Sequence, residues 1–498
     1  MFLRIVLLAV SLCLGSTSLV SADATQPYFT HHAVSTTNPQ AQLLFDEGLT
    51  DVYAFNRQAA EGAFRGALAI DPKLAIAWWG VALARGPNIN IRMSEDDMVS
   101  ASQAIGKAKS LEANASREEA ALIDALATRY GTGGDQVKYA APYAVAMQKV
   151  AGAFPDDPDV EALYVDAMLD ALWFKSPLRG MPSERDMQKR VAEDVRRWPE
   201  HIGLLHYFIH FTEPNRTPLA LTVADRLAAF NFAPQESHLT HMPSHVYMYI
   251  GAWGKMSALN HEAVEMDLAQ AKAAAIQPTH LDYFFHNLEF WYGSAVMAAN
   301  ANQADAAVAE WARYNQDAKW IAAARFGDIS RATAIMDGAG ISKKLASAAF
   351  RDVFYYGLVC AANGRASDAQ GTIALLQRRF PDSAVRPLAI DIIKGRLAET
   401  NGDLVAARTL YGQAATTQDR LQFEDAPPWN FAPRELLAAM ELRTGDAAAA
   451  VAAAEADLRK HPAGVPTLTI LENSYMALGR MDDAAKARQE IDSQGVTQ

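Results

Sequence analysis

The chain has 498 residues, of which 50% are hydrophobic and 20% are charged, so it can bury a large core and is not a disordered protein. Its 57 acidic side chains outnumber the 45 basic ones, and the formal net charge is −12. Because nucleic-acid binding requires a basic surface, this charge argues against nucleic acid as a partner.

Residues 1–22 are predicted to form a secretory signal peptide. Arg4 provides the positive charge, residues 5–14 form a short apolar run, and residues 20–22 have the small-x-small pattern of a cleavage site. The apolar run is too short for a permanent membrane anchor. We therefore expect a periplasmic or secreted protein with no transmembrane segment after cleavage, and an extended N-terminal segment over residues 23–38.

The rest of the chain is predicted to be all-α. It lacks the alternating β-branched runs of strands, and Ala-rich amphipathic stretches of helical length are separated by Gly, Asn and Pro. The first helix-turn-helix unit is marked by regularly spaced small, aromatic and turn residues: Gly48, Ala60, Phe64, Ala67 and Pro72. Between about residues 90 and 200 the helices persist but the period is lost, which predicts irregular insertions.

Histidines are concentrated in the middle of the chain. Nine of the 12 lie between His201 and His286, where even scattering would place about two. Imidazole is polar, titrates near neutral pH and is the commonest metal ligand in proteins. This clustering therefore predicts a functional site.

The first histidine group is a helical stripe. His206, His210 and Glu213 have i, i+4, i+7 spacing, which places them on one face of a helix. Two histidines and one glutamate with an open coordination position form a set that zinc accepts. The alternative is that these groups are buried and hydrogen-bonded between helices, and the sequence leaves both open.

A second group follows after a proline. Its histidines have i, i+3, i+7 spacing and precede a further histidine downstream: His238, His241, His245 and His286. Pro243 lacks a backbone donor, so the helix either begins near Met242 or kinks there. In the first case His238 lies in a loop, and in the second the kink directs His241 and His245 inward.

Turn residues and small residues recur at regular spacing in the C-terminal part of the chain. The turn glycines are separated by 38, 43 and 34 residues: Gly364, Gly402, Gly445 and Gly479. Each is followed five residues later by an alanine where two helices are expected to cross: Ala369, Ala407, Ala450 and Ala484. Cys360, the one cysteine left after signal cleavage, is expected to be a buried packing residue without a disulfide partner.

These spacings resemble the tetratricopeptide repeat, a 34-residue helix-turn-helix unit. The resemblance implies a right-handed α-solenoid with a concave groove, divided into a tetratricopeptide-like array with a His-rich groove over residues 39–295 and a second array over 296–498. With Gly251 at repeat position 15, His241 and His245 fall at positions 5 and 9, which face the groove in this family and often bind a peptide carboxylate.

The middle region also resembles a subgroup of exported bacterial tetratricopeptide proteins. The shared signatures are GPN-x-N, here residues 86–90, and HMPSH, here residues 241–245. The resemblance implies where the site lies but no particular reaction. Asn88 and Asn90 either cap a turn or contact a ligand through their amides.

Two functions follow from these patterns. The first is an exported scaffold that binds a peptide or protein partner in its groove, through His241, His245, Tyr249, Asn88 and Asn90. The second is a metal-dependent enzyme or metal-binding protein holding a divalent transition metal, zinc or copper. Its predicted ligands are His206, His210, Glu213, His241, His245 and His286. Under the metal hypothesis Glu213 is either a ligand or a general base acting on metal-bound water, and the catalytic residues stay unknown. A structural element of an envelope complex remains a third alternative.

Overall fold

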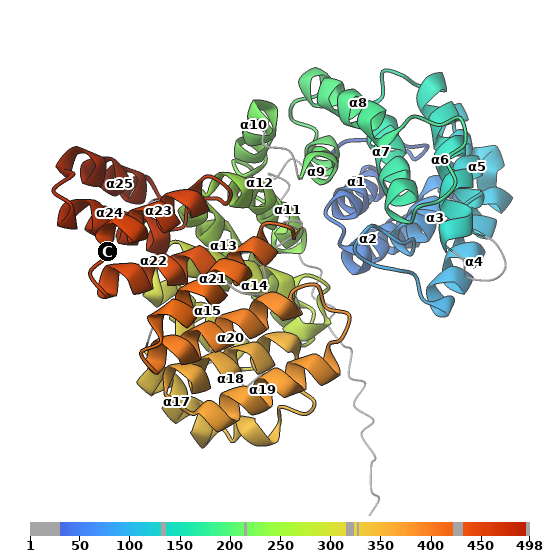
Figure 1. Cartoon of the computed structure of the whole chain (residues 1–498). Coiled ribbons are helices and arrows are strands. Elements are labelled where there is room, and N and C mark those ends of the chain that lie inside the picture. Colours follow the sequence, from blue (N-terminus) through green and yellow to red (C-terminus); the bar gives the residue numbers. More distant parts are fainter. Residues whose placement is uncertain are drawn as a thin grey trace, which may run out of the picture.

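The computed structural model describes residues 30–130, 136–213, 217–314, 323–325, 328–421 and 432–494. Throughout these residues the regular structure is helical, without a β-strand (Figure 1). The predicted all-α class is confirmed over the described ranges. The predicted signal peptide lies outside them. None of the described helices is both long and apolar enough to cross a membrane.

The N-terminal helices pack against their neighbours in the sequence, beginning with the hairpin of α1 and α2. They are α1 (Pro39–Tyr53), α2 (Arg57–Ile70), α3 (Ala75–Ala84), α4 (Glu95–Leu111), α5 (Arg117–Ala127), α6 (Gln136–Ala153), α7 (Pro158–Trp173) and α8 (Glu184–Arg197). Side chains fix several starts, since Ser94, Ser116 and Ser183 each close a capping box at a helix N-terminus.

The middle of the chain holds the histidine-rich helices. They are α9 (Ile202–Thr212), α10 (Pro218–Leu227), α11 (Ser237–His241), α12 (Pro243–Ile250), α13 (Trp253–Ala273) and α14 (Phe284–Met297). Short 3₁₀ turns at Pro234–Glu236 and Pro278–His280 precede α11 and α14. In Figure 1 these helices connect the N-terminal helices with the C-terminal ones.

The C-terminal helices form successive hairpins, such as α20 with α21 and α24 with α25. They are α15 (Ala301–Trp311), α17 (Ile329–Gly338), α18 (Phe350–Ala362), α19 (Ala366–Arg379), α20 (Arg386–Thr400), α21 (Leu404–Gln418), α22 (Pro433–Arg443), α23 (Ala447–Leu458), α24 (Val465–Ala477) and α25 (Met481–Ser493). Stacked hairpins of this kind make a tetratricopeptide-like α-solenoid, as predicted.

The predicted turn glycines and crossing alanines have the roles expected of them. Gly364, Gly402, Gly445 and Gly479 all have positive φ, between 68° and 90°, which side chains with a Cβ rarely adopt. The four alanines that follow them are at most 5% exposed, so neighbouring helices approach closely there. Cys360 is also buried, and burial raises the pKa of its thiol to about 11.

Phe64 is the central packing residue of the first unit. Its fully buried ring lies where a Cβ on Gly48 would come within 2.7 Å and a Cβ on Gly80 within 2.5 Å. Glycine at both positions therefore creates the space for this ring, and α1, α2 and α3 can pack tightly around it.

The C-terminal end of the solenoid contacts its middle. The indole N–H of Trp253, at the start of α13, donates to the carbonyl of Ala463 at 2.8 Å, and its backbone N–H donates to Gln494 Oε1 at 3.1 Å. A Cβ on Gly251 would lie 3.2 Å from the Ala463 backbone. The helices α22 to α25 accordingly lie beside α12 and α13 in Figure 1.

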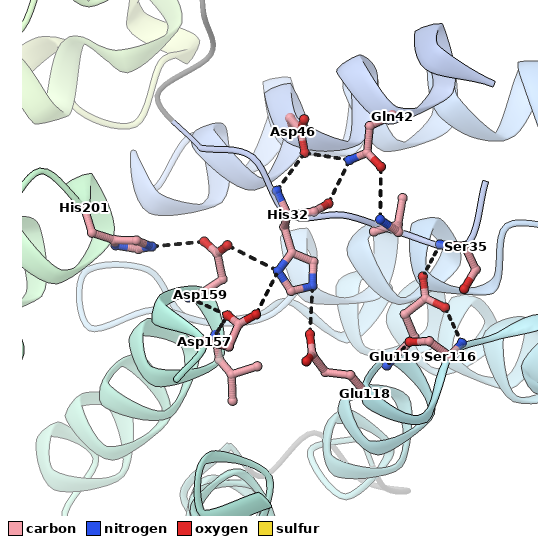
Figure 2. Close-up of polar contacts among 12 residues, drawn as sticks. His32, Ser35, Gln42, Asp46, Ser116, Glu118, Glu119, Asp157, Asp159 and His201 are labelled. Carbon is pink, nitrogen blue, oxygen red and sulfur yellow. Dashed lines mark hydrogen bonds and ion pairs between the residues drawn. The ribbon is translucent and has the colours of Figure 1, made fainter. Parts of the chain in front are cut away.

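Residues 30–38 form no helix and are held against the N-terminal helices by His32 (Figure 2). The backbone N–H of His32 donates to Asp46 Oδ1 at 3.1 Å. Its ring Nδ1 lies 3.2 Å from Asp159 Oδ2, and its Nε2 lies 3.3 Å from Glu118 Oε1. Burial by itself lowers the pKa of His32, but Asp159 and the nearby carboxylates raise it to about 9, so the ring is an imidazolium.

Asp159 connects this segment to the histidine-rich helices. It accepts a hydrogen bond from the Tyr53 hydroxyl at 2.7 Å and lies 3.0 Å from His201 Nε2. Burial raises the pKa of Asp159, but His201 and His32 more than offset it and hold the pKa below its usual range. Tyr53 is the last residue of α1, and its carbonyl faces the histidine cluster described next.

Candidate metal centre

Six histidines from four helices meet in the interior between the N-terminal and C-terminal helices. Helix α9 carries His206 and His210, α11 carries His238 and His241, α12 carries His245, and α14 carries His286. They form two adjoining triads. Triad A is His241, His245 and His286, and triad B is His206, His210 and His238; in each, one ligand atom per residue lies within 4.8 Å of the others.

Triad A is tightly convergent. The Nε2 of His241 lies 2.9 Å from the Nε2 of His245 and 3.1 Å from the Nε2 of His286. Imidazoles bound to one tetrahedral zinc at about 2.0–2.1 Å have nitrogens roughly 3.3 Å apart. The observed spacing is close to that value, so these three rings could hold one metal ion with little movement.

The joint at Pro243 explains how His241 and His245, the two histidines of the HMPSH signature, both point into triad A. Helix α11 ends at His241 and α12 begins at Pro243, while Met242 between them keeps helical dihedrals of −53° and −37°. The chain therefore continues as two joined helices, and the His245 N–H bonds to the Met242 carbonyl at 3.2 Å. His238 lies inside α11 and not in a loop, which resolves the alternative that the sequence left open.

The acceptors behind triad A fix which ring nitrogen carries hydrogen. Asn260 donates through Nδ2 to Ser244 Oγ and to the Met256 carbonyl, both at 2.7 Å, so its Oδ1 is an acceptor. This Oδ1 lies 2.6 Å from His241 Nδ1, which must therefore donate. The Nε2 of His241 is left with a lone pair directed into the triad.

Glu213 lies behind the other imidazoles. One carboxylate oxygen makes a short contact with His245 Nδ1, and the other lies 3.9 Å from His210 Nδ1. The carboxylate thus faces the Nδ1 atoms and not the convergent Nε2 atoms, a different position from that of the direct ligand predicted from the sequence. Burial raises the pKa of Glu213, but His245 and His210 offset this and hold it well below its usual range.

Triad B has the same design. The Nδ1 of His206 lies 2.6 Å from the Tyr53 carbonyl, which can only accept, so the Nε2 of His206 carries a lone pair. This Nε2 lies 3.0 Å from the Nε2 of His210. His238 completes the triad, and neither of its ring nitrogens has a hydrogen-bond partner among the residues that the structure describes.

A buried carboxylate holds α11, α13 and α14 in register. Asp267 on α13 accepts from Ser237 Oγ at 2.6 Å and from Asn287 Nδ2 at 2.8 Å. These partners immediately neighbour His238 and His286 in the sequence. Burial raises the pKa of Asp267 to about 6. One side chain therefore positions a histidine of each triad.

Burial keeps most of the cluster uncharged. It holds the pKa of His206, His238 and His241 well below the usual value, with the neighbouring histidines lowering it further. Burial likewise lowers the pKa of His286 to about 3. Neutral imidazole is the form that binds metal ions.

The other predicted ligand-contact residues lie around the cluster. Asn88 is 6% exposed and accepts from the backbone N–H of Asn90 at 2.9 Å, the turn-capping alternative considered above. The side chain of Asn90 donates to the Tyr283 hydroxyl at 3.3 Å, and the Tyr283 ring stacks on His238 at 3.9 Å. Tyr249 is buried on α12. The GPN-x-N loop is thus joined to the cluster through Tyr283.

His238 is the residue that the predicted metal set omits. Its position three residues before His241 was visible in the sequence, but Pro243 left its place in a helix or a loop undecided. His238 belongs to triad B because α11 packs near α9, which carries His206 and His210. This packing joins distant parts of the chain, so no local sequence pattern predicts it.

Comparisons of the sequence and the fold with known proteins identify no family for this chain. No protein-family model matches the sequence, and no curated protein matches it. Among solved structures, the crystal structure of yeast Tom70 aligns over 92% of this chain and 92% of its own, with 11% sequence identity and a TM-score of 0.28. A likeness at that level carries no inference about function. The fold and the site define an all-helical protein of tetratricopeptide-like hairpins with a buried histidine cluster.

Proposed function

We propose that the protein is a metalloprotein in which triad A holds a resident transition-metal ion, zinc or copper. Three neutral imidazoles are the ligand type that both ions accept, and they leave a coordination position open for water or another small ligand. A metal-dependent enzyme or a metal-binding protein would both use such a centre. The predicted ligands His241, His245 and His286 are the ones that this proposal places on the ion.

One observation carries the proposal: the ring nitrogens of triad A converge around the Nε2 lone pair of His241. The Nδ1 of His241 donates to Asn260, so its Nε2 carries a lone pair, which lies 2.9 Å from the Nε2 of His245 and 3.1 Å from the Nε2 of His286. These buried ring nitrogens have lost their hydration, which is costly unless each finds a partner. A cation bound among them would be a partner for all three rings at once, whereas one hydrogen bond joins only two of them.

Burial supports a resident ion more than a transported one. His241 is 0% exposed and His245 is 4% exposed. An ion bound there exchanges only after the surrounding helices move. The open position of a three-histidine site is where a metal-activated water forms, which is the chemistry such a centre would supply.

Binding of a peptide or protein partner in a concave groove stays a prediction. The burial of His241 and His245 means that a bound peptide would not touch them without local opening, whereas Asn90 is exposed. Replacing Asn90 with alanine and comparing the proteins that co-purify with each variant tests this role. Unchanged co-purification would count against a contact through this loop.

Export to the periplasm or the medium is likewise proposed, from the leader-like residues 1–22. Cell fractionation followed by N-terminal sequencing tests it. A mature chain that begins near Asp23 supports export, and an intact Met1 in the cytoplasmic fraction contradicts it.

The metal proposal is tested by elemental analysis of the full chain purified without a histidine tag. The protein is stripped with a chelator, incubated separately with Zn²⁺ and Cu²⁺, and desalted. We expect at least one tightly held equivalent of one of these ions, and its loss in His241→Ala/His286→Ala. His261→Ala is the matched control, because the His261 side chain is 42% exposed and outside both triads.

Less than about a tenth of an equivalent of either ion would contradict the proposal. So would a double variant that binds as much metal as the His261→Ala control. Far-UV circular dichroism of each variant shows whether the helices are retained.

A further inference from the structure

Triad B repeats the features that support an ion in triad A, although the two use different helices. His206 is fully buried and His238 is 2% exposed. The Nδ1 of His206 is committed to the Tyr53 carbonyl, so its lone pair at Nε2 faces His210 Nε2 at 3.0 Å. In triad B, as in triad A, the Nε2 lone pair of one buried imidazole therefore lies close to the Nε2 of a second histidine.

His238 gives independent evidence for a missing partner. Its ring stacks on Tyr283, yet no hydrogen bond to either ring nitrogen is found within the described part of the chain. Leaving a buried polar group without a partner is costly, so native proteins rarely keep one. A cation bound by His206, His210 and His238 would satisfy it. His238 also lines a small pocket with Phe55 and Tyr283.

The two triads are connected through shared structural parts. His238 and His241 lie one turn apart on α11, with ring centroids 5.8 Å apart, and the rings of His210 and His245 are 6.4 Å apart. Glu213 faces the Nδ1 of His210 in triad B and of His245 in triad A. A carboxylate behind two metal-binding imidazoles orients both rings and makes both more basic.

We propose that the centre is dinuclear, with one transition-metal ion in triad A and a second in triad B, linked by Glu213 as a shared outer-shell acceptor. This inference rests on the proposed function and extends it from one ion to two. It assigns His238 as a metal ligand and Glu213 as a positioning residue for both ions. Neighbouring ions of this kind bind a single small ligand between them more readily than either ion does alone.

The number of ions bound by the wild-type chain is the primary test. The stripped, tag-free protein is titrated with Cu²⁺ and, separately, with Zn²⁺, washed with a weak chelator, and analysed for bound metal. We expect two equivalents of at least one ion in the wild type and in His261→Ala. We expect one equivalent in His238→Ala and one in His286→Ala.

The outcomes separate this inference from the proposed function. One equivalent in the wild type that persists in His238→Ala and disappears in His286→Ala overturns the second ion and leaves the proposed function standing. Less than about a tenth of an equivalent in the wild type overturns both. Two equivalents that persist in both single variants mean that the ions bind elsewhere, and this also overturns both.

Two further variants keep the test decisive if His238→Ala fails to fold. His206→Asn removes less of the side chain than His238→Ala does, and it removes a different ligand of triad B. The His206→Asn variant should therefore also bind one equivalent. Glu213→Gln keeps the size of the side chain and should retain both ions while weakening each by about 10–100-fold. An effect of Glu213→Gln on one ion alone would contradict the shared role of Glu213.

Discussion

The imidazolium of His32 gives a sharp prediction about stability and pH. His32 is buried among Asp159, Asp157 and Glu118, while the His31–Asp46 pair lies on the other side of the segment. In the folded chain the pKa of His32 is about 9, against 6.5 without these contacts. Its charge therefore stabilises the fold fully below pH 6.5, and this contribution is lost as the pH rises through about 9.

The magnitude follows from the two pKa values. A rise from 6.5 to about 9 on folding corresponds to about 3 kcal/mol of stability that disappears between pH 6 and pH 10. In His32→Asn the imidazole is gone, so that variant has no such loss. The difference in unfolding free energy between the wild type and His32→Asn should shrink by about 3 kcal/mol over this range.

Urea denaturation followed by circular dichroism at pH 6, 8 and 10, with chelator present, measures this difference. His280→Asn is the control, because His280 is exposed and its replacement should change the unfolding free energy little. A difference between wild type and His32→Asn that stays constant from pH 6 to pH 10 would refute the charged state of His32.

Three other variants test packing and the outer shell of the centre. Phe64→Ala should lower the unfolding free energy by about 3–5 kcal/mol in urea denaturation, because no neighbour can fill the space between Gly48 and Gly80; a loss under about 1 kcal/mol would contradict this. Trp253→Phe should cost about 1 kcal/mol by removing the hydrogen bond to the Ala463 carbonyl, and an unchanged urea midpoint would show that this contact is not stabilising. Asn260→Ala should weaken metal binding by about 10–100-fold in chelator competition, and unaltered affinity would argue that Asn260 does not orient a ligand.

Local patterns predicted the fold because repeat architecture is built from neighbours in sequence. The turn glycines and the crossing alanines act within one hairpin, and each is visible in a stretch of fewer than ten residues. The loop residue Asn88 illustrates the same point, since its capping bonds to Asn90 and Ile91 are local. Such features need no knowledge of distant parts of the chain.

The candidate centre was predicted only in part because it joins helices far apart in the sequence. The convergence of His241 and His245 follows from their i, i+4 spacing, which survives the joint at Pro243. The division of six histidines into two triads depends on how α9 and α14 pack against α11. Glu213 was expected beside the ion, but its approach to Nδ1 atoms depends on that same packing.

The contact between Trp253 and the last helices affects the order in which the chain can assemble. A linear array of repeats can complete its structure from any starting point, since each unit needs only the adjacent ones. Here the start of α13 meets Ala463 and Gln494, more than two hundred positions later in the chain. The surface next to the HMPSH helix is therefore finished only after α24 and α25 have been synthesised, and a chain that stops short of them leaves this region uncovered.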